Sequence, residues 1–175
     1  RSDGMLIWKM NHENDDTTSC INGTATVGAC YLAEATGDMS YYEKAKKLYS
    51  AWRNSSMYVR EGEEVGHVWD TMHEYWCSTY NQGTFIGAAT MLYEHFGDNS
   101  YYEDACNAVN HTMKALCYNN ILIKEDAYIT DNSKMRGILM RYLRKFIVDF
   151  NRQEYLSFFQ DNAKIKWMNK NSKNL

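Results

Sequence analysis

A repeat of about 60 residues is the feature that most constrains how this chain can fold. When residues 22–45 are placed over residues 82–105, twelve of the 24 positions are identical, which is far beyond chance. The identical residues of the first copy are Gly23, Thr24, Ala29, Leu32, Glu34, Gly37, Asp38, Ser40, Tyr41, Tyr42, Glu43 and Ala45. A fainter third copy begins at Gly137, and each copy has a tyrosine 18 residues after its first glycine. The chain therefore consists of three copies of one unit.

Each unit has the pattern of two helices joined by a short turn. Small and apolar residues recur at helical spacing between 22 and 36, and their small size permits close helix contacts. Gly37 ends this helix, because glycine readily adopts the left-handed conformation that a C′ position needs. Ser40 and Glu43 then match a capping box for the second helix. The predicted helices are 22–36, 40–53, 82–96, 100–116, 134–149 and 152–169.

The connections alternate between short turns and long links. Residues 37–39 and 97–99 are turns within a unit, whereas residues 54–81 and 117–133 link one unit to the next. Each long link enters the first helix of the next unit, so all of them should emerge on one face, where binding and catalysis usually occur. The period is too long for tetratricopeptide or ankyrin repeats and suits an αα-toroid. We predict an all-α fold of αα-hairpin repeats at 22–53, 82–116 and 134–169, about half of an (α/α)6 toroid or barrel.

Composition excludes several classes of partner. The 175 residues carry a net charge of −3, and the pI of about 6.0 gives no basic surface for nucleic acid or an anionic membrane. Mean hydropathy is −0.60, and no apolar run approaches the roughly 20 residues of a membrane helix. Proline is absent, which favours a mostly helical chain. We therefore expect no nucleic-acid partner and no membrane span.

Cysteine and histidine spacing predicts neither disulfides nor a metal site. Five cysteines, an odd number with no CxxC pair, suit neither a disulfide framework nor zinc, and favour a reducing, cytoplasmic compartment. His67 and His73 lie near several glutamates without ligand spacing on one helix face, so we expect a solvated loop there. No cofactor is indicated. The chain begins at Arg1 without an initiator methionine or signal peptide, which predicts a piece of a longer protein.

The run Thr-Tyr-Asn-Gln-Gly at residues 79–83 and several other segments resemble glycoside hydrolase family 76, whose members are α-1,6-mannanases and related cell-wall mannan enzymes on an (α/α)6 barrel. Residues 79–88 resemble the TYNQG segment of that family, and residues 20–23 resemble its preceding NG repeat. Residues 134–143 resemble its FKGIFxRYL segment, residues 160–167 its closing xNAxxxW stretch, and residues 4–9 its GGIWW motif. The resemblance spans nearly the whole chain in the order of the family.

The resemblance implies that residues 1–175 are the carboxyl-terminal half of one glycosidase domain. Family members use two adjacent aspartates as nucleophile and acid/base, as retaining glycosidases do, within the amino-terminal half. Asp15 and Asp16 follow the GGIWW-like segment and precede the NG repeat, with no aromatic residue after them. By order and context they form a polar loop. We therefore expect no catalytic residue in this chain.

The resemblance also implies part of a sugar-binding cleft along the long links. Aromatic rings stack on sugar rings, and polar side chains pair with hydroxyls. Asp70 falls near a family aspartate in the loop before TYNQG, and Trp8, Trp69 and His73 are further candidates. The predicted substrate-binding residues are Asp70, Tyr80, Asn81, Gln82 and Asn22. The competing interpretation is local: Asn22 caps its helix and Gln82 satisfies backbone groups of a first turn.

Two functions from different classes follow. The first is a fragment of a retaining glycoside hydrolase acting on α-1,6-linked mannan, which needs its missing amino-terminal half. The second is a non-catalytic helical-hairpin module that binds a glycan or protein through its long-loop face. An open half-toroid exposes apolar flanks and should self-associate or pair with complementary helices. The apolar residues of the last unit, Leu139, Leu143, Phe146 and Phe150, favour the fragment.

Overall fold

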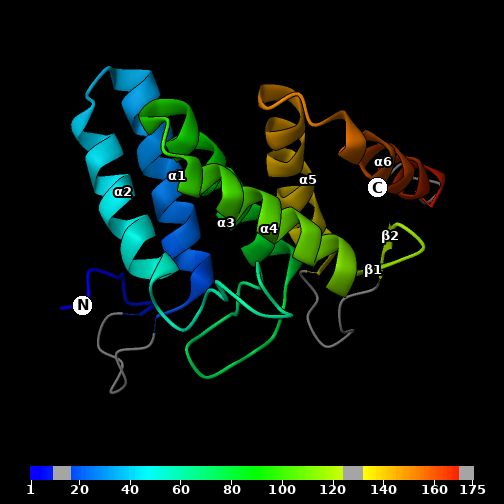
Figure 1. Cartoon of the computed structure of the whole chain (residues 1–175), viewed down its shortest axis with the longest axis horizontal. Coiled ribbons are helices and arrows are strands. Elements are labelled where there is room, and N and C mark those ends of the chain that lie inside the picture. The colour runs from blue at the N-terminus through cyan, green and yellow to red at the C-terminus, as the bar shows by residue number, and fades with distance from the viewer. Residues whose placement is uncertain (10–16, 124–131, 170–175) are drawn as a thin grey trace.

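The fold is a row of three helical hairpins. The structure, a computed structural model, describes residues 1–9, 17–123 and 132–169. The helices in this part of the chain are α1 (Ser19–Thr36), α2 (Ser40–Arg53), α3 (Thr79–Phe96), α4 (Asn99–Ala115), α5 (Asn132–Asp149), the short 3₁₀ helix η1 (Gln153–Tyr155) and α6 (Leu156–Met168). Helices α1, α3 and α5 pack side by side with α3 in the middle, and each contacts the second helix of its own hairpin (Figure 1). The predicted helices are confirmed, with ends that differ by at most four residues.

The long connections lie on one face, as the repeat predicts. The described parts of the links that follow α2 and α4 run along the same side of the row as residues 1–9, opposite the short turns (Figure 1). The second link contains a two-stranded hairpin of β1 (Cys117–Tyr118) and β2 (Ile121–Leu122). Its turn residues Asn119 and Asn120 both have positive φ, as a tight hairpin turn requires. Asn162 of α6 holds this hairpin by accepting from Leu122 N at 2.9 Å and donating to Asn120 O at 2.9 Å.

The short turns follow the repeated Gly-Asp pair. Gly37 and Gly97 are left-handed C-caps, with φ of 75° and 69°. The predicted capping box at Ser40 is wrong, because Ser40 is the first residue of α2 and its N-cap residue makes no side-chain bond. Instead Asp38 Oδ1 accepts from Ser40 N, and Asp98 Oδ1 accepts from Ser100 N, both at 2.9 Å. An aspartate carboxylate two residues upstream meets the free amide at the helix start, so the serine hydroxyl is not needed there.

Glycines on the first helices allow these helices to approach closely. A Cβ on Gly23 of α1 would lie 2.4 Å from Oγ1 of Thr84 in α3. A Cβ on Gly83 of α3 would lie 2.6 Å from Cα of Leu139 in α5. Real Cβ atoms do not approach backbone atoms this closely, so the spacing of the row depends on these glycines. Gly28, which the sequence pattern also assigned to close contacts, has no neighbouring atom within 4 Å of such a Cβ among the described residues.

The core between α2, α3 and the first link is aromatic. Trp52, Tyr49, Phe85 and Tyr58 are buried, with Phe85 stacked on Tyr58 at 4.2 Å between ring centroids. Edge-to-face and offset contacts of this kind add about 0.5–1.5 kcal/mol per pair beyond burial. The hydroxyl groups of Tyr49 and Tyr58 donate to the carboxylate of Asp104 at 2.8 and 3.2 Å.

Asp104 is the ionic centre of this core. Its side chain is almost fully buried on α4, and the Arg53 guanidinium at the end of α2 donates to both of its oxygens. Charge-assisted bonds to both oxygens and two phenols leave this carboxylate fully paired. The pair therefore fixes the end of α2, the start of the link and α4 relative to one another.

The apolar residues of the last unit are covered within the chain. Leu139, Leu143 and Phe146 are fully buried, and Phe146 packs on Tyr155 with ring centroids 5.8 Å apart. The interpretation of these residues as an uncovered flank is wrong, because α3 and the third hairpin itself enclose them.

No helix in residues 1–9, 17–123 and 132–169 is long and apolar enough to cross a membrane.

Replacing Gly83 by alanine should separate α3 from α5. We expect Gly83→Ala to lower the free energy of unfolding by about 1–3 kcal/mol, because the added methyl group overlaps the α5 backbone. Gly137→Ala is the matched control, because Gly137 is exposed in α5 and no described atom lies within 4 Å of the added Cβ. It should raise stability by up to about 1 kcal/mol through helix propensity alone. Urea unfolding of both variants makes the comparison, and equal effects would contradict the close-approach explanation.

Candidate functional site

The predicted substrate-binding residues cluster where α1 and α3 begin. Thr18 and Ser78, 60 residues apart, are the N-cap residues, and their hydroxyl groups accept from Ile21 N and Asn81 N. The repeat therefore places equivalent first turns side by side on the long-loop face.

Asp70 lies between these two first turns. Its backbone carbonyl accepts from Ser19 N of α1 at 2.8 Å, and its Oδ1 accepts from Asn81 Nδ2 of α3 at 2.8 Å. An isolated bridge between Thr18 and Thr71 continues this contact. The side chain of Asp70 is half-buried, and no bond to its Oδ2 is found in the described part of the chain. The second oxygen is therefore available to accept from a ligand hydroxyl.

Tyr80 and Asn81 complete this cluster. The Tyr80 hydroxyl donates to the carbonyl of Cys20 at 3.4 Å across the α1–α3 contact. Burial, together with the nearby Cys20 and Asp70, raises the pKa of the Tyr80 phenol, so it stays a neutral donor. Asn81 is fully buried, and among the described residues its Oδ1 has no hydrogen-bond partner. The cluster thus offers a carboxylate oxygen and a phenol within two adjacent turns, and the buried Asn81 amide holds the carboxylate in place.

Asn22 and Gln82, which the repeat aligns, are both fully buried and bonded to the protein's own loops. Asn22 Oδ1 accepts from Leu6 N at 3.0 Å, and its Nδ2 donates to Thr17 Oγ1 and Thr18 O. The N-cap residue is Thr18, so Asn22 does not cap its own helix. The hydrogen-bond partners of both amides in the described residues are groups of the protein itself. Contact of either amide with a glycan therefore stays a prediction.

Gln82 ties the first long link to α4. Its Oε1 accepts from Val68 N at 2.7 Å, and its Nε2 donates to Gly66 O at 3.1 Å and Ala108 O at 3.0 Å. These are buried backbone groups, which are costly to leave unpaired. The partners are distant loop and α4 groups, so the interpretation of Gln82 as serving its own first turn is wrong.

Aromatic side chains lie along the link beside Asp70. Trp69 and Tyr75 meet edge to face with ring centroids 4.1 Å apart, and Tyr75 is 64% exposed. Trp8 is 51% exposed, with the Lys9 ammonium over its ring. His73 is exposed in the same link. Tyr75 and Trp8 thus present ring surface on which a sugar could stack.

His67 is not part of a solvated loop, contrary to the sequence-based expectation. It is only 7% exposed and its ring stacks on that of His111 in α4, with centroids 4.6 Å apart. Gly66, at φ +90°, brings the link so close to α4 that a Cβ would lie 2.1 Å from the Asn107 carbonyl oxygen. The partner histidine is 44 residues away in sequence, so local spacing gave no sign of it. These two histidines and Cys77 form a cluster that could hold a metal ion.

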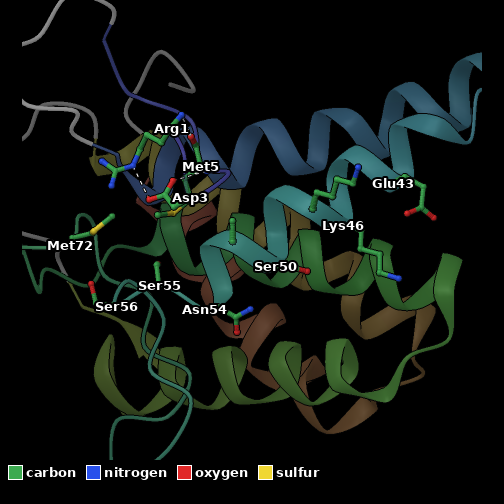
Figure 2. A pocket seen from close by; sticks show the side chains of 12 residues that line it. Arg1, Asp3, Met5, Glu43, Lys46, Ser50, Asn54, Ser55, Ser56 and Met72 are labelled. Carbon is green, nitrogen blue, oxygen red and sulfur yellow. Dashed lines mark hydrogen bonds and ion pairs between the residues drawn. The ribbon is translucent and has the colours of Figure 1, made fainter.

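A separate hollow of about 860 Å³ opens between the amino-terminal segment and the polar side of α2. Figure 2 shows Arg1, Asp3 and Met5 on one side and Glu43 and Lys46 along α2. None of the predicted substrate-binding residues lines it. We therefore place the candidate site at the first turns of α1 and α3 and not in this hollow.

Comparisons with known proteins point to one family. A model of glycosyl hydrolase family 76 matches residues 1–175. The chain is similar to the mannan endo-1,6-alpha-mannosidase DCW1 of Candida glabrata, with 23% identity over 175 positions. These positions cover 91% of this chain and 38% of that protein.

Solved structures agree in fold. The α-1,6-mannanase GH76A of Salegentibacter sp. HEL1_6 is 30% identical with a TM-score of 0.83, and the match covers 97% of this chain and 53% of that one. An inactive variant of the same enzyme, with two aspartates replaced by asparagine, is in complex with α-1,6-mannotriose. It matches with 29% identity, a TM-score of 0.82 and the same coverage. The chain thus spans about half the length of these structures.

Removing the Gln82 amide should loosen the link that carries Asp70. We expect Gln82→Leu to lower the free energy of unfolding by about 2–4 kcal/mol, because it leaves the buried Val68 N and Gly66 O without partners, whereas Ala108 O keeps its bond from Thr112 Oγ1. Gln160→Leu, at an exposed position of α6, is the control and should change it by less than about 0.5 kcal/mol. Urea unfolding measures both, and similar small effects would show that Gln82 does not anchor the link.

Proposed function

The chain belongs to glycosyl hydrolase family 76, and on that premise we propose that it is the carboxyl-terminal half of a domain that hydrolyses α-1,6-linked mannan. Its three hairpins have the fold of about half of an (α/α)6 barrel. In this proposal the complete barrel needs further hairpins that precede residue 1.

An uncovered face of α1 carries the proposal. Ile21, Ala25, Gly28, Leu32 and Ala35 recur at spacings of four and three, so they form one stripe along the helix. Each of these residues is at least partly exposed, and Leu32 is 47% exposed. An apolar stripe of this kind on a helix normally packs against another element.

The repeat indicates what covers this stripe. The equivalent residues of α3 include Phe85, Ala88 and Leu92, which are all fully buried. They face the preceding hairpin, where Phe85 contacts Trp52 of α2 with ring centroids 4.9 Å apart. By the same geometry, the stripe on α1 fits the second and first helices of a hairpin placed before it. The partner that we propose is therefore the amino-terminal half of the same domain.

The proposed reaction is a retaining double displacement with two aspartates. One carboxylate attacks the anomeric carbon and forms a glycosyl ester, while the other protonates the departing oxygen. The second carboxylate then takes a proton from water, which releases the sugar from the ester. The inactive Salegentibacter variant, changed at two aspartates, supports such a pair in that enzyme. We assign this pair to the amino-terminal half. The adjacent aspartates of this chain, Asp15 and Asp16, lie outside the described residues.

This half would bind the mannan chain beside the reacting bond. Asp70 Oδ2 and the Tyr80 hydroxyl are placed to pair with sugar hydroxyls, and the Tyr75 and Trp8 rings offer stacking surfaces on the same face. Asn81 would act mainly by orienting Asp70. Asn22 and Gln82 would support the site through the loops that they hold.

Loss of the Asp70 charge should slow turnover of mannan. In the full-length protein we expect Asp70→Asn to lower kcat/KM for α-1,6-mannan by about 10–100-fold, since a charged hydrogen bond contributes about 1.5–3 kcal/mol. Asp161→Asn, an exposed residue of α6, is the control and should leave it unchanged. Manno-oligosaccharide release measures both, and unchanged kinetics for Asp70→Asn would remove it from the site.

A charge on the α1 stripe should disrupt the complete domain. In the full-length protein we expect Leu32→Glu to lower the free energy of unfolding by about 3 kcal/mol or more, because it would bury an unpaired carboxylate. Met39→Glu is the matched control, since Met39 is also 47% exposed but lies in the short turn. Thermal or urea unfolding compares the two. Equal, small effects would mean that the stripe faces solvent in the whole protein.

A further inference from the structure

The cluster of His67, Cys77 and His111 lies apart from the proposed sugar contacts and has the chemistry of a metal site. One nitrogen of each histidine and the sulfur of Cys77 all lie within 4.8 Å of one another. The three residues come from different places: the middle of the link after α2, the residue before the N-cap of α3, and α4. Two imidazoles and a thiolate are donors that Zn²⁺ prefers.

The two imidazoles lack the hydrogen bonds that buried histidines normally make. His67 and His111 are 7% and 6% exposed, and among the described residues none of their four ring nitrogens has a hydrogen-bond partner. The carboxylate of Glu64 lies 3.8 Å from Nδ1 of His67, too far for a hydrogen bond. Four unpaired nitrogens in one buried spot would cost several kcal/mol if nothing bound there.

Burial of both rings favours the neutral imidazole over the charged form. Burial lowers the pKa of His67, and burial together with the neighbouring His67 lowers the pKa of His111 to about 4. A neutral imidazole has a lone pair on one ring nitrogen, and this is the form that coordinates a metal ion.

We propose that His67, Cys77 and His111 bind one Zn²⁺ ion that fastens the first long link to α3 and α4. With Zn–N of about 2.0–2.1 Å and Zn–S of about 2.3 Å, a tetrahedral ion sets its ligand atoms roughly 3.5 Å apart. The three donor atoms thus need to close by about 1 Å. The two rings, which are stacked with 16° between their planes, must also turn so that a lone pair of each points at the ion. Glu64, whose side chain is 66% exposed, offers a carboxylate for the fourth position.

The position of the site gives the ion a structural task. The link between His67 and Cys77 contains Asp70 and the exposed Tyr75, so the ion would join both ends of the segment that carries the proposed sugar contacts. Closing a loop in this way restricts it without altering the groups at its tip. The ion would hold Asp70 in place and would not take part in the reaction.

The test uses the untagged full-length protein. After extraction with chelator, one equivalent of Co²⁺ should produce the visible bands of a tetrahedral ion and a near-ultraviolet thiolate-to-cobalt band, and Zn²⁺ should abolish both. Elemental analysis should find one zinc per chain after reconstitution. Chelator should lower the Tm of the wild-type protein and added Zn²⁺ should restore it. These measurements require no variant, so a folding defect cannot obscure them.

Variants then locate the ion. Cys77→Ser should abolish the thiolate band, and His111→Gln should weaken Zn²⁺ binding by at least about 100-fold. Cys106→Ser on α4 and His73→Gln in the same link are matched controls and should bind like the wild type. No thiolate band and no saturable zinc in the wild-type protein would overturn the proposal. A thiolate band that persists in Cys77→Ser would also overturn it, since the ion would then lie elsewhere.

Discussion

The close approach of α3 to its two neighbouring helices is the constraint on which the rest of the structure depends. Gly23 and Gly83 remove the Cβ atoms that would collide with Thr84 and with the backbone at Leu139. With the three first helices this near, their amino-terminal turns meet on one face. That proximity lets Ser19 and Asn81 bond to Asp70 from two different repeats. The candidate site is therefore a consequence of helix spacing.

Buried polar side chains then fix the first long link to the helical frame. Gln82 satisfies backbone groups of the link and of α4 with one amide, and Asp104 gathers Arg53, Tyr49 and Tyr58. Such groups are stable in the interior only when all their bonds are made, so they allow few alternative positions of the link. The first link is long, but these buried hydrogen bonds fix its position relative to the helices. This is the property that a loop carrying binding residues requires.

The apolar stripe on α1 and the equivalent residues of α3 differ in burial, and this difference bears on both assembly and function. A stripe that is buried in α3 is exposed in α1, although the two helices derive from the same pattern. The difference lies in the neighbour, because α3 has a hairpin before it, whereas the described residues contain no hairpin before α1. The same stripe that closes the core inside this chain thus offers a surface for assembly at its first helix. The proposed catalytic pair and the proposed binding residues would meet across that surface.

The sequence alone determined the three hairpins, the helix ends to within four residues, the single face for the long links and the family. These follow from local rules: helical spacing of small residues, the Gly-Asp punctuation and a 60-residue period. The cap at Ser40, the burial of His67 and the partners of Gln82 were decided only by the tertiary structure. Each depends on atoms brought close by folding, and local spacing carries no information about them. The pairing of His67 with His111 shows this most plainly, because 44 residues separate two rings that pack 4.6 Å apart.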